Sequence, residues 1–232
     1  MDTVRYLSHL RECRNVFRNR THAGRCIAYM IEERNAIVMG IPAGGTPVAA
    51  VVAGALGFSL DVVVVSKITL PWNTEAGYGA VAFDGSMRLN ENLVRAAGLG
   101  RDQVEAGIDR TRIKVAERMK RLRGCKPPLD LRGKTVIVVD DGLASGYTMR
   151  VAVEALTRGG VGKLIVAVPT GHAEAVEEIA HKVQAIYCPN IRSGANFAVA
   201  DAYESWTDVS AAEAEAILKN FEVVSPRKTP AQ

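Results

Sequence analysis

The feature that most constrains the fold is an apolar run that ends in two adjacent carboxylates. Val136–Val139 consists of β-branched residues, which is typical of a buried strand, and Asp140 and Asp141 follow it directly. A turn of mostly small residues, Gly142–Gly146, then leads into a predicted helix. A buried strand that passes through a short turn into a helix is the repeating unit of a parallel sheet. The sequence therefore predicts an α/β fold.

Other segments repeat this alternation along the chain. The predicted strands are Ala36–Met39, Leu60–Val65, Thr135–Val139, Lys163–Val168 and Ala185–Tyr187. The predicted helices are one that opens at Pro47, Arg101–Arg123, Thr148–Arg158, Ala173–His181 and Ala211–Phe221. Together they indicate a mainly parallel five-stranded sheet with helices on both faces.

The stretch from Ala36 to Leu60 contains no charged residue and is long enough to cross a membrane. The run Gly40–Pro47, however, holds glycines and prolines that would break a helix exposed to lipid. The stretch is better interpreted as a buried strand, a glycine-rich loop and a helix with Pro47 in its first turn. We therefore expect no association with a membrane.

Residues 66–92 break the regular pattern. They hold Pro71, Asn73, Gly77, Gly79, Asp84 and Gly85, and short alternating stretches occur at Ala80–Phe83 and Met87–Leu89. This composition predicts a long mobile loop that contains a hairpin, with Asp84-Gly85 as its turn.

The composition indicates one globular domain over residues 1–232. Hydrophobic residues make up 48% and charged residues 23%, and the net charge is +4. The four cysteines and four histidines show neither metal-ligand spacing nor a disulfide framework. The N-terminus does not resemble a signal peptide, so we expect a cytoplasmic protein.

The charge is distributed unevenly. Residues 101–126 hold nine Lys and Arg against four Asp and Glu. Such a surplus is typical of a solvated helix face, and it is also compatible with binding to nucleic acid.

The residues after the strand at 135–139 have the chemistry of a sugar-phosphate site. Carboxylates at the end of a strand can accept hydrogen bonds from the two vicinal hydroxyls of a ribose. The small residues Ala144–Thr148 allow backbone N–H groups and hydroxyls to surround a phosphate, and the N-terminus of the following helix favours its negative charge. The alternative is that one of the two acids simply caps this helix.

Val136–Thr148 resembles the fingerprint of the type I phosphoribosyltransferases, which bind 5-phosphoribosyl-1-pyrophosphate (PRPP). The resemblance implies that Asp140 and Asp141 hold the ribose hydroxyls and contact Mg²⁺ indirectly, through PRPP. The residues that it assigns to the 5-phosphate are Ala144, Ser145, Gly146, Tyr147 and Thr148.

The resemblance extends to the glycine-rich loop after the first strand, which corresponds to the pyrophosphate loop of the family. The implied pyrophosphate ligands are Ala43, Gly44, Gly45 and Thr46. Related sequences often have an arginine where this chain has Ala43. Positive charge must then come from Lys67 or from another loop residue. Lys67 lies at the end of the second predicted strand, and the resemblance places it among the catalytic residues.

Three further parts of the chain match the family more loosely. The segment 68–92 corresponds to a flexible loop that closes over the site, with Trp72, Asn73 and Glu75 as its candidate residues. Residues 1–34 and 189–221 flank a core of about 35–188 and form a small hood that selects the base, followed by a polar tail at 222–232. Phe197 is either a core residue of this hood or a surface on which the base stacks.

The implied activity is transfer of 5-phosphoribose from PRPP to a nitrogenous base, with release of pyrophosphate and with Mg²⁺ as cofactor. Ala144 occupies a position where enzymes acting on 6-oxopurines usually carry an aspartate, which disfavours hypoxanthine and guanine as acceptors. A homodimer that does not bind nucleic acid is expected. The alternatives are a PRPP-sensing regulator that binds nucleic acid through residues 101–126 and another enzyme that uses a pentose phosphate.

Overall fold

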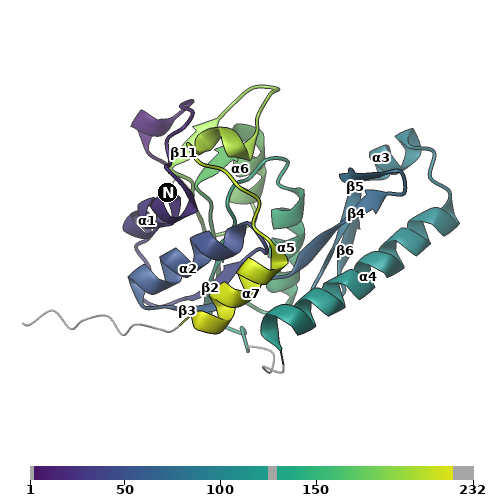
Figure 1. The fold of residues 1–232 in the computed structure, drawn as a ribbon, viewed down its shortest axis with the longest axis horizontal. Helices are drawn as coiled ribbons and strands as arrows, with labels where there is room; N and C mark the ends of the chain where they lie inside the picture. Colours follow the sequence, from purple (N-terminus) through teal and green to yellow (C-terminus); the bar gives the residue numbers. More distant parts are fainter. Residues whose placement is uncertain (1–2, 125–129, 222–232) are drawn as a thin grey trace, which may run out of the picture.

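The computed structural model describes residues 3–124 and 130–221 and shows an α/β fold (Figure 1). Its central sheet has the strand order β1-β10-β8-β7-β2-β3, and every neighbouring pair is parallel. The strands are β1 (Val4–Arg5), β2 (Ile37–Gly40), β3 (Ser59–Val62), β7 (Thr135–Val139), β8 (Lys163–Ala167) and β10 (Ala185–Tyr187). The predicted parallel α/β architecture is confirmed.

The predicted number of five strands is wrong, because β1 adds a sixth strand at the edge of the sheet. This strand is only two residues long and pairs Val4 with Ile186. A strand of two residues is too short to produce an alternating pattern, so the sequence does not reveal it.

Helices cover both faces of the sheet. α1 (Arg20–Met30) and α2 (Gly45–Leu56) pack on one face, whereas α5 (Tyr147–Arg158) and α6 (Ala173–Ala180) pack on the other. The side chains of β7 alternate between the two layers, with Ile137 in the first and Val138 in the second. Both layers are buried, which explains the continuous apolar character of β7. None of the described helices is both long and apolar enough to cross a membrane.

Most of the segment predicted as a long loop is strand, which corrects its expected structure. β4 (Val65–Leu70), β5 (Asn73–Ala82) and β6 (Met87–Leu89) form an antiparallel sheet in that order. α3 (Glu91–Ala96) and α4 (Arg101–Arg123) follow, and residues 65–123 project from the central sheet as an arm (Figure 1). The predicted turn at Asp84-Gly85 is confirmed, since Gly85 has φ +80° and links β5 to β6.

Side-chain packing explains why this glycine-rich segment forms a sheet. Tyr78 and Val81 pack toward Ile108 of α4, whereas Ala80 and Ala82 belong to the layer that contains α5. A β-carbon on Gly79 would lie 2.8 Å from the carbonyl oxygen of Arg88 in β6. The glycine therefore permits close packing of strands at a position where the sequence pattern predicts a loop.

Part of the predicted hood covers the carboxyl end of the sheet. Residues 7–19 and 189–207, called the hood from here on, are joined by backbone bonds such as Phe17 N to the Ala202 carbonyl, 2.9 Å. The hood includes the 3-10 helices η1 (Ser8–Leu10) and η2 (Val199–Ala202) and the strand β11 (Asn190–Arg192), which pairs with β9 (Thr170–His172). α1 and α7 (Ala211–Asn220), which the sequence also assigned to the hood, pack instead against α2.

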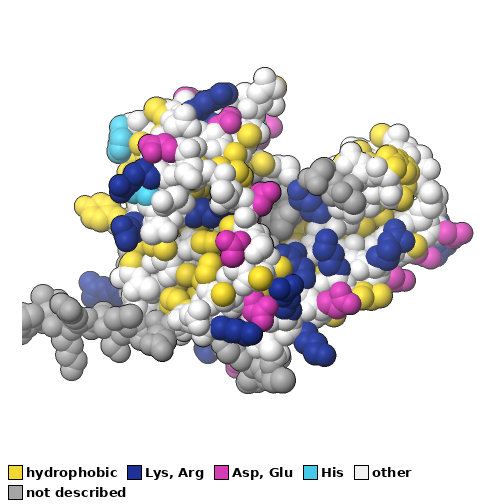
Figure 2. Space-filling model, viewed as in Figure 1, with side chains coloured by type: hydrophobic (Ala, Val, Ile, Leu, Met, Phe, Trp, Pro, Cys, Tyr) yellow, Lys and Arg dark blue, Asp and Glu magenta, His cyan; other side chains and the backbone are white. Residues whose placement is uncertain are grey.

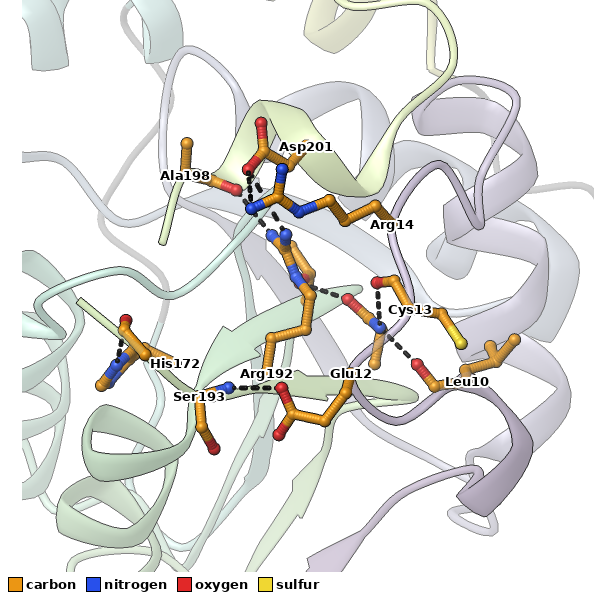
Figure 3. A network of polar contacts seen from close by, with 12 residues as sticks. Leu10, Glu12, Cys13, Arg14, His172, Arg192, Ser193, Ala198 and Asp201 are labelled. Carbon is orange, nitrogen blue, oxygen red and sulfur yellow. Dashed lines mark hydrogen bonds and ion pairs between the residues drawn. The ribbon is translucent and has the colours of Figure 1, made fainter. Parts of the chain in front are cut away.

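A network of polar contacts holds the hood together (Figure 3). The amide of Asn190 donates to the carbonyl oxygens of Leu10 and Cys13, and the carboxylate of Glu12 accepts from Ser193 N at 2.9 Å. The buried Arg192 donates to the Ala198 carbonyl at 2.6 Å. The bonds of Asn190 and Glu12 connect the two segments of the hood, and that of Arg192 lies within the second segment.

Candidate functional site

Asp140 stands at the end of β7, between two adjoining cavities. One cavity has a volume of about 340 Å³ and the other about 200 Å³, and Asp140, Lys67 and Thr148 line both. One carboxylate oxygen of Asp140 accepts a hydrogen bond from Asp141 N at 2.9 Å. Burial, followed by the neighbouring charge of Asp141, raises the pKa of Asp140 well above its ordinary value. Raised carboxylate pKa values are common in functional sites.

Asp141 points to the hood and lines neither cavity. Its Oδ2 atom accepts from Arg20 Nε at 3.0 Å and Nη2 at 2.8 Å, and the two side chains are only 15% and 11% exposed. Arg20 also donates to the Thr207 carbonyl and lies 3.9 Å from the ring centroid of Trp206. The hydroxyl of Tyr203 donates to the Asp141 carbonyl at 2.6 Å. Asp141 therefore joins the central sheet to the hood.

The predicted pyrophosphate loop packs directly on this acidic pair. A β-carbon on Gly44 would lie 2.1 Å from Asp141 Oδ2, and one on Gly45 would lie 2.8 Å from Asp140 Cα. Both positions therefore require glycine. Thr46 follows in the first turn of α2, and its buried hydroxyl has no hydrogen-bond partner in the described part of the chain. The structure thus brings the loop and the acids together.

All five residues predicted to bind the 5-phosphate line the smaller cavity. This cavity lies at the N-terminus of α5, where Gly146 is the residue before the helix and has φ +69°. Ser145 and Ala144 are exposed, and Thr148 is partly buried. Backbone N–H groups and the positive end of a helix dipole make such a place suitable for a phosphate.

Two cations of α4 line the larger cavity together with Lys67. Lys114 and Arg118 lie one helical turn apart, and Arg118 donates to Ser66 Oγ at 3.1 Å and to the Pro42 carbonyl at 3.0 Å. Burial lowers the pKa of the Arg118 guanidinium. The sequence did not single out Lys114 or Arg118 from the basic stretch. Their spacing of four residues was the available signal, because it places both on one helix face.

The candidate residues of the closing loop lie elsewhere. Trp72 is 63% exposed at the turn between β4 and β5, and neither Trp72 nor Asn73 lines the two cavities. The side chain of Glu75 lies outside the described part of the structure. Trp72 lies five positions after Lys67, which is about 16 Å along an extended chain. In this conformation the turn is remote from the acidic pair.

The aromatic candidate Phe197 belongs to the hood. The guanidinium of Arg192 lies 4.5 Å from its ring centroid, and the His172 ring lies edge-on at 5.6 Å. His172 in turn contacts the Gly194 carbonyl at 3.2 Å (Figure 3). Val199, which the sequence did not identify, is the hood residue that lines the smaller cavity. It packs so closely on Gly142 that a β-carbon there would lie 2.3 Å from Val199 Cγ1.

Comparison with known proteins defines the class to which this fold and site belong. The model of the phosphoribosyl transferase domain matches residues 15–202. The chain belongs to this family.

Two similar proteins cover most of this chain, and a third matches only a part of it. A protein of Mycobacterium tuberculosis with a provisional phosphoribosyl transferase name is 32% identical over 206 residues, which are 88% of this chain and 46% of that protein. The chain thus spans about half the length of this curated relative. The crystal structure of TT1426 from Thermus thermophilus has 33% identity and a TM-score of 0.70, covering 88% of this chain and 98% of that one. The bifunctional protein PyrR of Gloeothece citriformis is 48% identical over 52 residues, which are 21% of this chain and 29% of that protein.

Proposed function

We propose that this chain transfers the 5-phosphoribosyl group from PRPP to a nitrogenous base and releases pyrophosphate. The main support for this proposal is that Asp140 lies between a cavity at a helix N-terminus and a second cavity lined by cations. PRPP has a phosphate at one end of its ribose and a diphosphate at the other. With the 5-phosphate at Ala144–Thr148 and the diphosphate beside Lys67, the ribose hydroxyls lie at Asp140.

Positioning and electrostatics account for the reaction. The bond between C1 of the ribose and the diphosphate oxygen breaks, a bond from C1 to the base nitrogen forms, and the base loses a proton. Positive charge develops on the ribose ring and negative charge on the departing diphosphate. Asp140 orients the ribose through its hydroxyls, and Lys67 stabilises the leaving group.

Mg²⁺ fits this site as an ion that arrives with the substrate. The described residues contain no group of three or more His, Cys, Asp or Glu that could hold a metal. Asp140 does place a carboxylate in both cavities, and oxygen atoms are the ligands that Mg²⁺ prefers. Diphosphate oxygens would supply most of the coordination, and the ion would neutralise charge on the leaving group.

The environment of α4 favours the enzyme over a regulator that binds nucleic acid. Lys114 and Arg118 line the cavity beside Asp140. Several of the other bases form ion pairs; these are Arg101–Glu105, Arg112–Asp109, Arg121–Glu215 and Arg123–Asp61. Less of the basic stretch is therefore available as a free cationic face.

A pyrophosphate-release assay tests the proposal. The chain is incubated with PRPP, Mg²⁺ and, one at a time, purines, pyrimidines and related heterocycles. We expect release that depends on one class of base, and a loss of about 100-fold or more in turnover for Asp140→Asn, because the ribose is no longer held by a charged group. Asp102→Asn, on the exposed start of α4, is the matched control and should keep full activity. Base-dependent release that is unchanged in Asp140→Asn would refute the assigned site.

A further inference from the structure

We propose that Lys114 and Arg118 of α4 bind the diphosphate together with Lys67. They would supply, from the arm, the positive charge that the loop lacks at Ala43. This inference rests on the proposed function and names the residues that recognise one part of its substrate.

The geometry places both cations beside Asp140. Lys114 and Arg118 line the cavity of about 340 Å³ that also holds Lys67 and Asp140. They come from α4, whereas Lys67 comes from β4, so the arm contributes all three cations. Figure 2 shows Lys and Arg side chains gathered along α4, where the arm meets the central sheet.

The charge of the cavity lining favours a polyanion. Asp140 is the one carboxylate among the described lining residues, against three cations. Lys67, Lys114 and Arg118 form no ion pair within 4.0 Å in the described part of the chain. A diphosphate carries several negative charges, and cations in a partly buried cavity bind it more strongly than they would in open solvent.

Arg118 is held in place for this role. Its guanidinium donates to Ser66 Oγ of β4 and to the Pro42 carbonyl of the pyrophosphate loop, at 3.1 and 3.0 Å. These bonds use only some of the N–H groups of the planar fork, which leaves others for ligand oxygens. A guanidinium fixed beforehand loses less conformational entropy when the ligand binds.

Substitution of Lys114 tests ligand binding without disturbing the packing of α4. Arg118 ties α4 to the loop, so its removal would disturb the fold as well as the cavity. Lys114 is exposed, and its side chain makes no hydrogen bond or ion pair within the described residues. A change in diphosphate affinity on loss of Lys114 therefore reports on the cavity itself.

The inference is tested by calorimetric titration in the presence of Mg²⁺. Two probes are used separately, inorganic pyrophosphate and ribose 5-phosphate. We expect Lys114→Met and Arg118→Met each to weaken pyrophosphate binding by about 10-fold or more, because each removes a charge-assisted contact. Binding of ribose 5-phosphate should stay within about twofold, because the proposed cradle for its phosphate lies at Ala144–Thr148. Arg118→Lys, which keeps the charge, should lose less than Arg118→Met. The matched control is Arg112→Met on the same helix, whose exposed pair with Asp109 lies outside the cavity.

The outcomes distinguish the two proposals. If the wild-type chain binds both probes and Lys114→Met leaves pyrophosphate affinity unchanged, the assignment of the α4 cations is wrong while the proposed function stands. If Lys114→Met weakens both probes equally, the cations do not recognise the diphosphate specifically, and the inference also fails. If the wild-type chain binds neither probe, the proposed function fails first.

Discussion

Asp140 and Asp141 are neighbours in sequence, but they belong to two different regions of the molecule. Asp140 faces the two cavities, and no other carboxylate among the described residues lines them. Asp141 faces the interface between α1 and the hood. Arg20 of α1 binds its carboxylate, and Arg20 also contacts the Thr207 carbonyl and the ring of Trp206 in the hood. The motif predicted one shared role for the two acids. The structure shows that a pair of adjacent carboxylates can face a cavity with one member and a protein interface with the other.

The two surroundings also differ in energetic terms. Burial and the nearby charge of Asp141 raise the pKa of Asp140, so its ionised form costs free energy in the folded protein. The charge of Asp141 is instead compensated by two hydrogen bonds from Arg20. Functional groups often reduce stability in this way, whereas structural groups increase it.

The largest stability effect is expected on the hood side. Arg20→Met should lower the free energy of unfolding by about 3 kcal/mol, because it leaves Asp141 largely buried without its cation. Urea denaturation measures this quantity. Arg14→Met is the matched control, because its pair with Asp201 is 3.8 Å long and the Arg14 side chain is 65% exposed, so it should change stability little. Equal effects for the two variants would show that the bond between Arg20 and Asp141 does not support the hood.

A smaller effect with the opposite sign is expected on the cavity side. Because the pKa of Asp140 is raised on folding, the stability of the wild-type chain falls as pH rises from the unfolded pKa to the folded one, and it stays lower above that range. Asp140→Asn removes this cost and should raise the melting temperature by about 2 °C at about pH 7.5. The gain should shrink as the pH approaches about 4, where the carboxyl of the unfolded chain also becomes protonated.

Asp141→Asn sharpens the contrast, because it should lower the melting temperature at neutral pH. This variant leaves the guanidinium of Arg20 without its carboxylate. Thermal denaturation of both asparagine variants provides the comparison. Shifts in the same direction would contradict the distinction between the two acids.

Much of the fold and one half of the site could be predicted from the sequence. The strand, the two acids, the turn and the helix at 135–158 are continuous in the chain, and each has a local signal in its residues. The same holds for the loop before α2, where Gly44 and Gly45 occur next to each other. Continuous motifs are predictable because short-range sterics and hydrogen bonding determine their shape.

The other half of the site depends on contacts between distant segments. Arg20 and Asp141 are 121 positions apart, and Arg118 lies 76 positions after Pro42. The spacing of four residues places Lys114 and Arg118 on one helix face, but nothing local shows that this face meets the loop at Pro42. The first half of β5 was missed for a related reason. Gly77 and Gly79 weaken its alternating pattern, although close packing against Lys67 and Arg88 requires small residues there.

Titration of the chain with PRPP and Mg²⁺ by calorimetry tests most directly the claim that one ligand spans both cavities across Asp140. We expect saturable binding at one site per chain, weakened by about 10-fold or more in Asp140→Asn, because the ribose hydroxyls lose a charged acceptor. Absence of PRPP binding to the wild-type chain, or equal affinity of the wild-type chain and Asp140→Asn, would contradict the account.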